Sequence, residues 1–140
     1  MPTRPRTHMQ DLKQRGKAPG VQQARREYER HRANDPALAE SKRIRNSSRW
    51  QRFRDWFKSR HPLCCNPLAL HPDEPRPTAQ AHHIIPLRKR PDLAFTESNI
   101  GPLCTKCHGA IEARERAGED TAALFKRWQR KQAEAMEDVL

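Results

Sequence analysis

Three short blocks of imidazole, amide and thiol side chains constrain this chain more than any other feature. In chain order they are His82-His83, Asn99 and Cys104-x-x-Cys107-His108. Imidazoles and thiolates bind metal ions, and an imidazole also exchanges protons near neutral pH. The fold must therefore bring these blocks together around metal ions.

The rest of the chain offers little material for a hydrophobic core. Only 34% of the 140 residues are hydrophobic, 32% are charged and 12 are proline, and the length corresponds to one modest folded unit. A bound metal ion adds folding free energy to a domain with a small core. Four Cys and seven His make such an ion the expected stabiliser.

The sequence predicts neither secretion nor insertion into a membrane. The N-terminal residues Met1–Arg6 contain no apolar segment of the kind a signal peptide needs, and nowhere do 18 apolar residues run together. We therefore expect a cytoplasmic location. Thiols stay reduced there, which favours metal ligation over disulfides.

Positive charge is concentrated at one end of the chain. Residues 1–60 carry 17 Lys and Arg against 6 Asp and Glu, a surplus of 11, which equals the net charge of the whole chain. DNA or RNA phosphates would bind such a segment with strong salt dependence. The alternative is a solubilising tail without a partner.

Residues 1–34 are expected to form a basic flexible arm. They mix Pro, Gly, Gln, Lys and Arg with little periodicity, and only residues 22–32 could be helical. Pro36 would end that helix, because the residue before a proline avoids the α region, and a second helix is expected to begin near Asp35.

The clearest helix is predicted from Arg49 to about Ser59. Ser48 is a favourable N-cap, and Gln51 three residues later completes a capping box. Apolar side chains recur on one face of this helix, at Trp50, Phe53 and Phe57. That face should pack on the metal-bound core.

A loop and a strand should follow this helix. Five prolines between residues 62 and 77 exclude a regular helix or a central strand there. Residues 79–87 are apolar and bounded by proline, which predicts a β-strand. Because successive strand residues point to opposite faces, His82 and His83 should have different roles.

The strand should belong to a hairpin that leads into a helix. Residues 88–98 would form the connection and residues 99–103 the return strand. A helix from about Thr105 would end near Gly118, a residue typical of helix C-termini, which completes a β-β-α unit. Residues 119–140 would form a C-terminal helix.

The three blocks resemble the motifs of HNH endonucleases of the ββα-metal, or His-Me finger, superfamily. The matching segments are Ala81–Leu87, Asn99–Leu103 and Cys104–His108. The resemblance implies a small α+β fold with a ββα-metal core and a zinc knuckle, flanked by N- and C-terminal helices. It divides the chain into the arm at residues 1–34, an HNH domain with its leading helix at residues 35–118, and the C-terminal helix at residues 119–140.

Carried over by position, the resemblance implies that His83 is the general base that activates water. His82 and His108 would hold one divalent cation, which could be Mg²⁺, Mn²⁺, Ni²⁺ or Zn²⁺. Glu112, one helical turn after His108, is a further candidate ligand, with an ordinary exposed helix residue as the favoured alternative. Asn99 would fix the hairpin and orient His83 through backbone hydrogen bonds.

A structural Zn²⁺ is expected at Cys104 and Cys107, which form half of a knuckle site. The family's other half is usually a second Cys-x-x-Cys, but here Cys64 and Cys65 are adjacent, and neighbouring thiolates seldom both reach one ion. The expected partners are therefore His71 and one of Cys64 and Cys65, with Cys64 slightly favoured. Loss of zinc in this chain is the alternative.

The reaction that the resemblance implies is metal-dependent hydrolysis of DNA with low sequence specificity, because backbone chemistry gains little from reading bases. A monomer would nick one strand. Basic side chains expected to grip flanking phosphates are Arg49, Arg52, Arg54, Lys58, Arg88, Lys89 and Arg90. For the last three, a solvated loop is an equal alternative. The build is similar to that of HNH proteins encoded by tailed phages beside packaging genes, which implies terminase subunits as partners.

A catalytically silent, zinc-stabilised nucleic-acid-binding module is the alternative from another class. It accounts for the basic arm and the cysteines equally well. It leaves His83 without a role.

Overall fold

A computed structural model describes residues 18–139 of the chain. Its contacts separate a first unit, which ends at Ala39, from a second that begins at Glu40. The first unit contains helix α2 (Pro19–Ala33) and the beginning of helix α3 (Pro36–Arg45). Half of the predicted arm, residues 1–17, lies outside the described residues.

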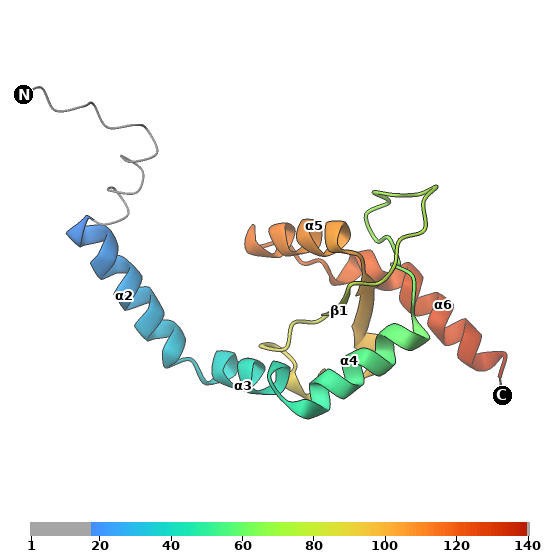
Figure 1. Cartoon of the computed structure of the whole chain (residues 1–140), viewed down its shortest axis with the longest axis horizontal. Coiled ribbons are helices and arrows are strands. Elements are labelled where there is room, and N and C mark those ends of the chain that lie inside the picture. Colours follow the sequence, from blue (N-terminus) through green and yellow to red (C-terminus); the bar gives the residue numbers. More distant parts are fainter. Residues whose placement is uncertain (1–17, 140) are drawn as a thin grey trace, which may run out of the picture. The chain divides into compact units, whose positions relative to one another are not determined.

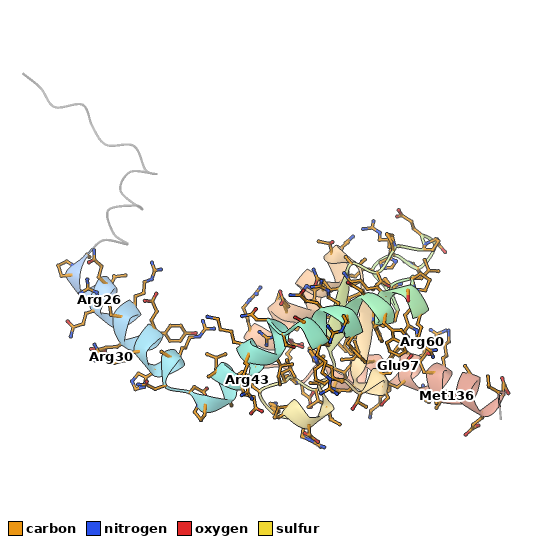
Figure 2. All side chains as sticks on the ribbon, turned by 60° about the horizontal axis from the view of Figure 1, so that its bottom comes forward. Arg26, Arg30, Arg43, Arg60, Glu97 and Met136 are labelled. Atoms are coloured by element: carbon orange, nitrogen blue, oxygen red, sulfur yellow. The ribbon has the colours of Figure 1, made fainter. Side chains whose placement is uncertain are left out.

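Helix α2 corrects the prediction for the described part of the arm. The helix includes residues 22–32 as expected but begins earlier, at Pro19, because proline is already suited to the first position of a helix. None of its residues is buried, and Arg25 pairs with Glu29 one turn later at 2.8 Å. Figure 2 shows Arg26 and Arg30 projecting from this exposed helix.

Helix α4 (Ser48–Arg60) confirms the predicted apolar stripe and corrects its cap. Ser47, not Ser48, is the N-cap: its hydroxyl accepts a hydrogen bond from the Trp50 backbone N–H at 3.1 Å. Trp50 and Phe57 are buried, and together with half-buried Phe53 they form a cluster around Ile100 of the hairpin.

The hairpin pairs strand β1 (Gln80–His83) with strand β2 (Ile100–Leu103) in antiparallel register, so that His82 lies opposite Gly101 and His83 opposite Ile100. Strand β1 is shorter than the predicted strand at residues 79–87. The pairing stops after His83, where Asn99 binds the backbone of the next two residues and the chain turns away.

Helix α5 (Thr105–Arg116) completes the ββα unit and confirms the small α+β fold. Helices α4 and α5 both contact the hairpin, on either side of it (Figure 1). The connection predicted at residues 88–98 contains a 3₁₀ turn, η1 (Pro91–Leu93), and runs into a second, η2 (Glu97–Asn99).

The end of α4 is tied to the turn η2. The carboxylate oxygen Oε1 of Glu97 lies 2.7 Å from Nε2 of His61 and 3.0 Å from Nε of Arg60. Arg60 and Glu97 are adjacent in Figure 2. This contact holds the turn that carries Asn99 against the leading helix.

The C-terminal segment is a 3₁₀ turn, η3 (Ala122–Phe125), followed by helix α6 (Lys126–Glu137), rather than one continuous helix. Phe125 is fully buried among Ile84, Leu103 and Ile111, so this segment belongs to the same core as the hairpin. Within residues 18–139, no helix is long and apolar enough to cross a membrane.

Gly101 allows Phe125 to approach the hairpin. A Cβ atom at Gly101 would lie 2.4 Å from Cε1 of Phe125, which is closer than Cβ atoms approach non-bonded atoms in proteins. The absence of a side chain at this position of β2 therefore lets the aromatic ring close the core.

We predict that Gly101→Ala lowers the free energy of unfolding by about 2 kcal/mol, because the added methyl group overpacks the core. Gly109→Ala is the matched control: Gly109 lies within α5, a Cβ there meets nothing within 4 Å, and the change should stabilise the protein by about 0.5 kcal/mol or more. Denaturant unfolding of both variants measures the difference. Equal stabilities would contradict the packing of Phe125.

Candidate active site and metal centre

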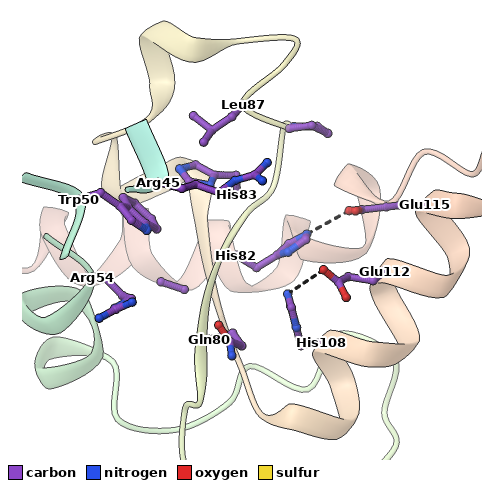
Figure 3. Close-up of a pocket in the computed structure, with 12 residues that line it drawn as sticks. Arg45, Trp50, Arg54, Gln80, His82, His83, Leu87, His108, Glu112 and Glu115 are labelled. Atoms are coloured by element: carbon purple, nitrogen blue, oxygen red, sulfur yellow. Dashed lines mark hydrogen bonds and ion pairs between the residues drawn. The ribbon is translucent and has the colours of Figure 1, made fainter. Parts of the chain in front are cut away.

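One cleft of about 310 Å³ collects most of the predicted catalytic side chains. Strand β1 forms its floor, with α4 on one side and α5 on the other (Figure 3). The polar residues that line it are Arg45, Arg54, Gln80, His82, His83, His108, Glu112 and Glu115. The predicted blocks His82-His83 and His108 therefore meet in space.

His83 is held in one orientation within this cleft. Its ring stacks on Trp50 with the centroids 4.6 Å apart, and its Nε2 lies 3.1 Å from the carbonyl oxygen of Ala94. Because a carbonyl can only accept a hydrogen bond, Nε2 carries the hydrogen and Nδ1 of the neutral ring keeps its lone pair. His83 therefore presents Nδ1 as a base.

Asn99 lies behind the cleft, where it clamps the hairpin. Its side-chain Oδ1 accepts from the Ile85 N–H at 2.9 Å, and its Nδ2 donates to the Ile85 carbonyl at 3.3 Å. Its backbone oxygen accepts from the Ile84 N–H at 2.8 Å. These bonds fix the chain directly after His83.

His82 lies on the opposite face of β1 and points toward α5 (Figure 3). Its ring meets that of His108 edge-on, with the centroids 5.5 Å apart, and stacks on Phe125. Nε2 of His82 is 3.0 Å from Oε1 of Glu115, while Nε2 of His108 is 3.5 Å from Oε1 of Glu112. Two imidazoles and two carboxylates thus gather at this end of the cleft, with His82 on β1 and the other three on α5.

A second cluster lies outside the cleft and consists of Cys64, His71, Cys104 and Cys107. Their ligand atoms all lie within 4.8 Å of one another, and in residues 18–139 no other group of three or more Cys, His, Asp or Glu side chains meets this distance. Nε2 of His71 is 3.5 Å from Sγ of Cys104 and 3.3 Å from Sγ of Cys107. Three thiols and one imidazole fit a tetrahedral structural metal ion such as zinc.

The hydrogen bonds around this cluster prepare it for a metal ion. Nδ1 of His71 donates to the Glu74 carbonyl at 2.9 Å, so Nε2 faces the sulfur atoms with its lone pair. The backbone N–H groups of Asn66 and Cys107 point at the sulfur atoms of Cys64 and Cys104, respectively. Burial raises the pKa of Cys104, but the Cys107 N–H and side-chain hydrogen bonds with Cys107, Cys64 and His71 lower it to about 7.

Cys65 does not enter the cluster. Its backbone N–H donates to the Pro102 carbonyl of β2 at 2.9 Å, and the following residue, Asn66, has a positive φ of 48°. Burial, with the nearby Cys64 thiol, raises the pKa of Cys65 to about 12. Of the two adjacent cysteines, the structure brings Cys64 to the other three ligands.

Comparison with known families agrees with this geometry. Residues 63–114 match the family model described as HNH endonuclease. These residues form an HNH endonuclease domain. The match includes every residue of the three predicted blocks, and it supports a nuclease-type function in general. Neither the curated proteins nor the solved structures gave a match.

The electrostatics of the HNH domain keep His83 uncharged. Burial lowers its pKa to about 4, against the hydrogen bond to Ala94, and the nearby charges of His82 and Arg45 lower it further. Burial also lowers the pKa of His108, and the negative charge of Glu112 partly offsets this effect. In contrast, hydrogen bonds from His82 and Thr121 outweigh burial and lower the pKa of Glu115.

Of the basic residues predicted to contact phosphates, the fold places only one in the cleft. Arg54 lines the cleft, whereas Arg49 lies over the ring of Phe95 at 3.9 Å. Arg90 is exposed and paired with Asp92 at 2.8 Å. The remaining four do not line the cleft: Arg52, Lys58, Arg88 and Lys89.

Sequence reasoning missed three residues of the cleft. Trp50 was assigned to the core alone, yet it also stacks on His83. Arg45 and Glu115 were not singled out, because a charged residue on a helix is ordinarily a solvated one. The position of Glu115, two turns after His108 on one helix face, was the available signal.

We predict that His71→Ala and Cys104→Ala lose the tightly bound zinc, because each removes a ligand from the cluster, and that their melting midpoints fall by about 10 °C. Cys65→Ala is the matched control and should keep one equivalent of zinc. Metal analysis of the purified variants, with thermal unfolding, measures both. Full zinc content in His71→Ala would contradict the ligand set.

Proposed function

We propose that the chain is a metal-dependent endonuclease that hydrolyses DNA phosphodiester bonds with His83 as the general base. The observation that carries this proposal is the environment of His83 in the cleft. Its Nε2 is bound to the Ala94 carbonyl, and its pKa of about 4 leaves Nδ1 free to take a proton from water at neutral pH. Asn99 keeps the backbone that carries this ring in place.

On the side of β1 opposite His83, the strand and helix α5 together supply donors that suit a divalent cation. His82, His108 and Glu112 offer imidazole and carboxylate groups, which fit Mn²⁺, Ni²⁺ or Zn²⁺, and Mg²⁺ through the carboxylate. Their ligand atoms are not as close together as those of the cysteine cluster. When bound, such a cation neutralises charge on the scissile phosphate and supports the departing 3′ oxygen.

The substrate is inferred from the positive charge around the cleft. Arg45 and Arg54 line it and would contact the phosphates beside the bond to be cut. Basic side chains elsewhere on α2 and α4 would hold flanking phosphates. Contacts of this kind do not read bases, so we expect low sequence specificity and 5′-phosphate products.

The biological setting is proposed from the same resemblance. A monomer with one cleft would nick a single strand. A role in phage DNA packaging with terminase subunits would suit a compact basic nuclease. The arm at residues 1–34 would then increase affinity for DNA while the HNH domain cuts.

We predict that His83→Ala lowers the rate of plasmid nicking by at least about 100-fold, because the other histidine of β1, His82, points to the opposite face. Gel-shift affinity for the same plasmid, far-UV circular dichroism and zinc content should remain unchanged. Nicking assays with Mg²⁺, Mn²⁺ and Ni²⁺ make the comparison. Inactivity of wild type and variant with every cation would instead favour the silent nucleic-acid-binding module.

We predict that Arg45→Gln lowers kcat/KM for nicking by about tenfold, because its charge faces the phosphate site in the cleft. Arg43→Gln is the matched control: it lies on the same helix, is exposed and pairs with Glu40, and it does not line the cleft. Its effect should stay below about twofold. Equal losses in the two variants would indicate a general charge effect rather than a site contact.

A further inference from the structure

Glu115 occupies a position in the cleft that the proposed chemistry does not yet use. A single oxygen, Oε1, lies 3.0 Å from Nε2 of His82 and 2.9 Å from the hydroxyl of Thr121. Thr121 is buried just before η3, and its hydroxyl donates to the carboxylate. Glu115 is thus held from both sides.

The ring of His82, like that of His83, is held in place by its neighbours. The His82 side chain is only 9% exposed, lies face to face with Phe125 and meets the edge of His108. By contrast, the side chain of Glu112 is 46% exposed and lies 3.5 Å from His108. The contact of Glu115 is the shorter and more buried of the two carboxylate–imidazole pairs.

The chemistry of this pair fixes which nitrogen of His82 is free. An ionised carboxylate can only accept hydrogen bonds, so the hydrogen between it and the ring must belong to Nε2. The neutral ring then carries its lone pair on Nδ1. Metal-binding histidines commonly donate their second N–H to a carboxylate, which orients the ring and raises the basicity of the ligand nitrogen.

We propose that Glu115 is a positioning residue for the catalytic cation site: it fixes His82 as the Nε2–H tautomer, so that Nδ1 is the atom that binds the cation. Thr121 holds the carboxylate in the required place. The inference rests on the proposed role of His82 as a cation ligand. It assigns distinct tasks to the two acids of α5, with Glu112 the candidate ligand and Glu115 the group that orients the imidazole.

The tautomer can be read directly by ¹⁵N NMR of the imidazole groups. In the full chain with its structural zinc in place, Nε2 of His82 should carry the hydrogen, and addition of a second equivalent of Zn²⁺ should shift the Nδ1 resonance. A resonance shift at Nε2 on metal addition, or a hydrogen on Nδ1 before it, would overturn the proposal.

Cation affinity gives the second readout, measured by calorimetry with Zn²⁺ on protein that already holds its structural zinc. Glu115→Gln should weaken the second site by about 10- to 100-fold, and Thr121→Val, which keeps the buried volume, should weaken it by a smaller factor. Glu119→Gln is the matched control, because that acid is 56% exposed and pairs with Arg114.

Two outcomes distinguish a missing cation site from a wrong role for Glu115. If wild-type protein binds no second Zn²⁺, both the cation site under the proposed function and this inference are wrong. If wild type and Glu115→Gln bind it with equal affinity, only the inference is overturned. Retention of the structural zinc in each variant shows that the domain has folded.

Discussion

The antiparallel pairing of β1 with β2 is the interaction on which the rest of the site depends. Because side chains alternate along a strand, this register sends His82 toward α5 and His83 toward Trp50. A slip by one residue would exchange the two imidazoles between their environments. Asn99 prevents such a slip at one end through its bonds to Ile85, and Phe125 fits only where Gly101 leaves room.

The cysteine cluster connects folding stability to the cleft. Cys104 and Cys107 belong both to the hydrophobic core, with Ile111 and Phe125, and to the group of potential metal ligands. A metal ion there would join the loop that carries His71 to the first turn of α5. His108 directly follows Cys107 on that turn, so the same ion would fix the position of a proposed cation ligand. A domain with few apolar residues thereby obtains a rigid site.

The features that could be predicted from the sequence are those encoded locally. Alternation around His82, the prolines of residues 62–77 and the helix signals after Cys104 were enough for the ββα unit, and the resemblance of the three motif blocks was enough for the HNH family. Features that depend on contacts between segments far apart in the sequence could not be predicted. The burial of Phe125 beneath Gly101 joins segments far apart in the chain, and the exclusion of Cys65 from the cluster depends on its backbone bond to Pro102 of the hairpin.

The two adjacent histidines show how one short strand can support two kinds of chemistry. Burial of His83 against the Trp50 ring disfavours a positive charge and outweighs the hydrogen bond to the Ala94 carbonyl, so the ring stays unprotonated at neutral pH. His82 faces the carboxylate of Glu115, which favours positive charge near the ring and therefore suits a cation. Residue type alone does not distinguish the two imidazoles. The hydrogen-bond partner of each Nε2 atom distinguishes them. For His83 the partner is Ala94, in the connection between the strands, and for His82 it is Glu115, in the last turns of α5.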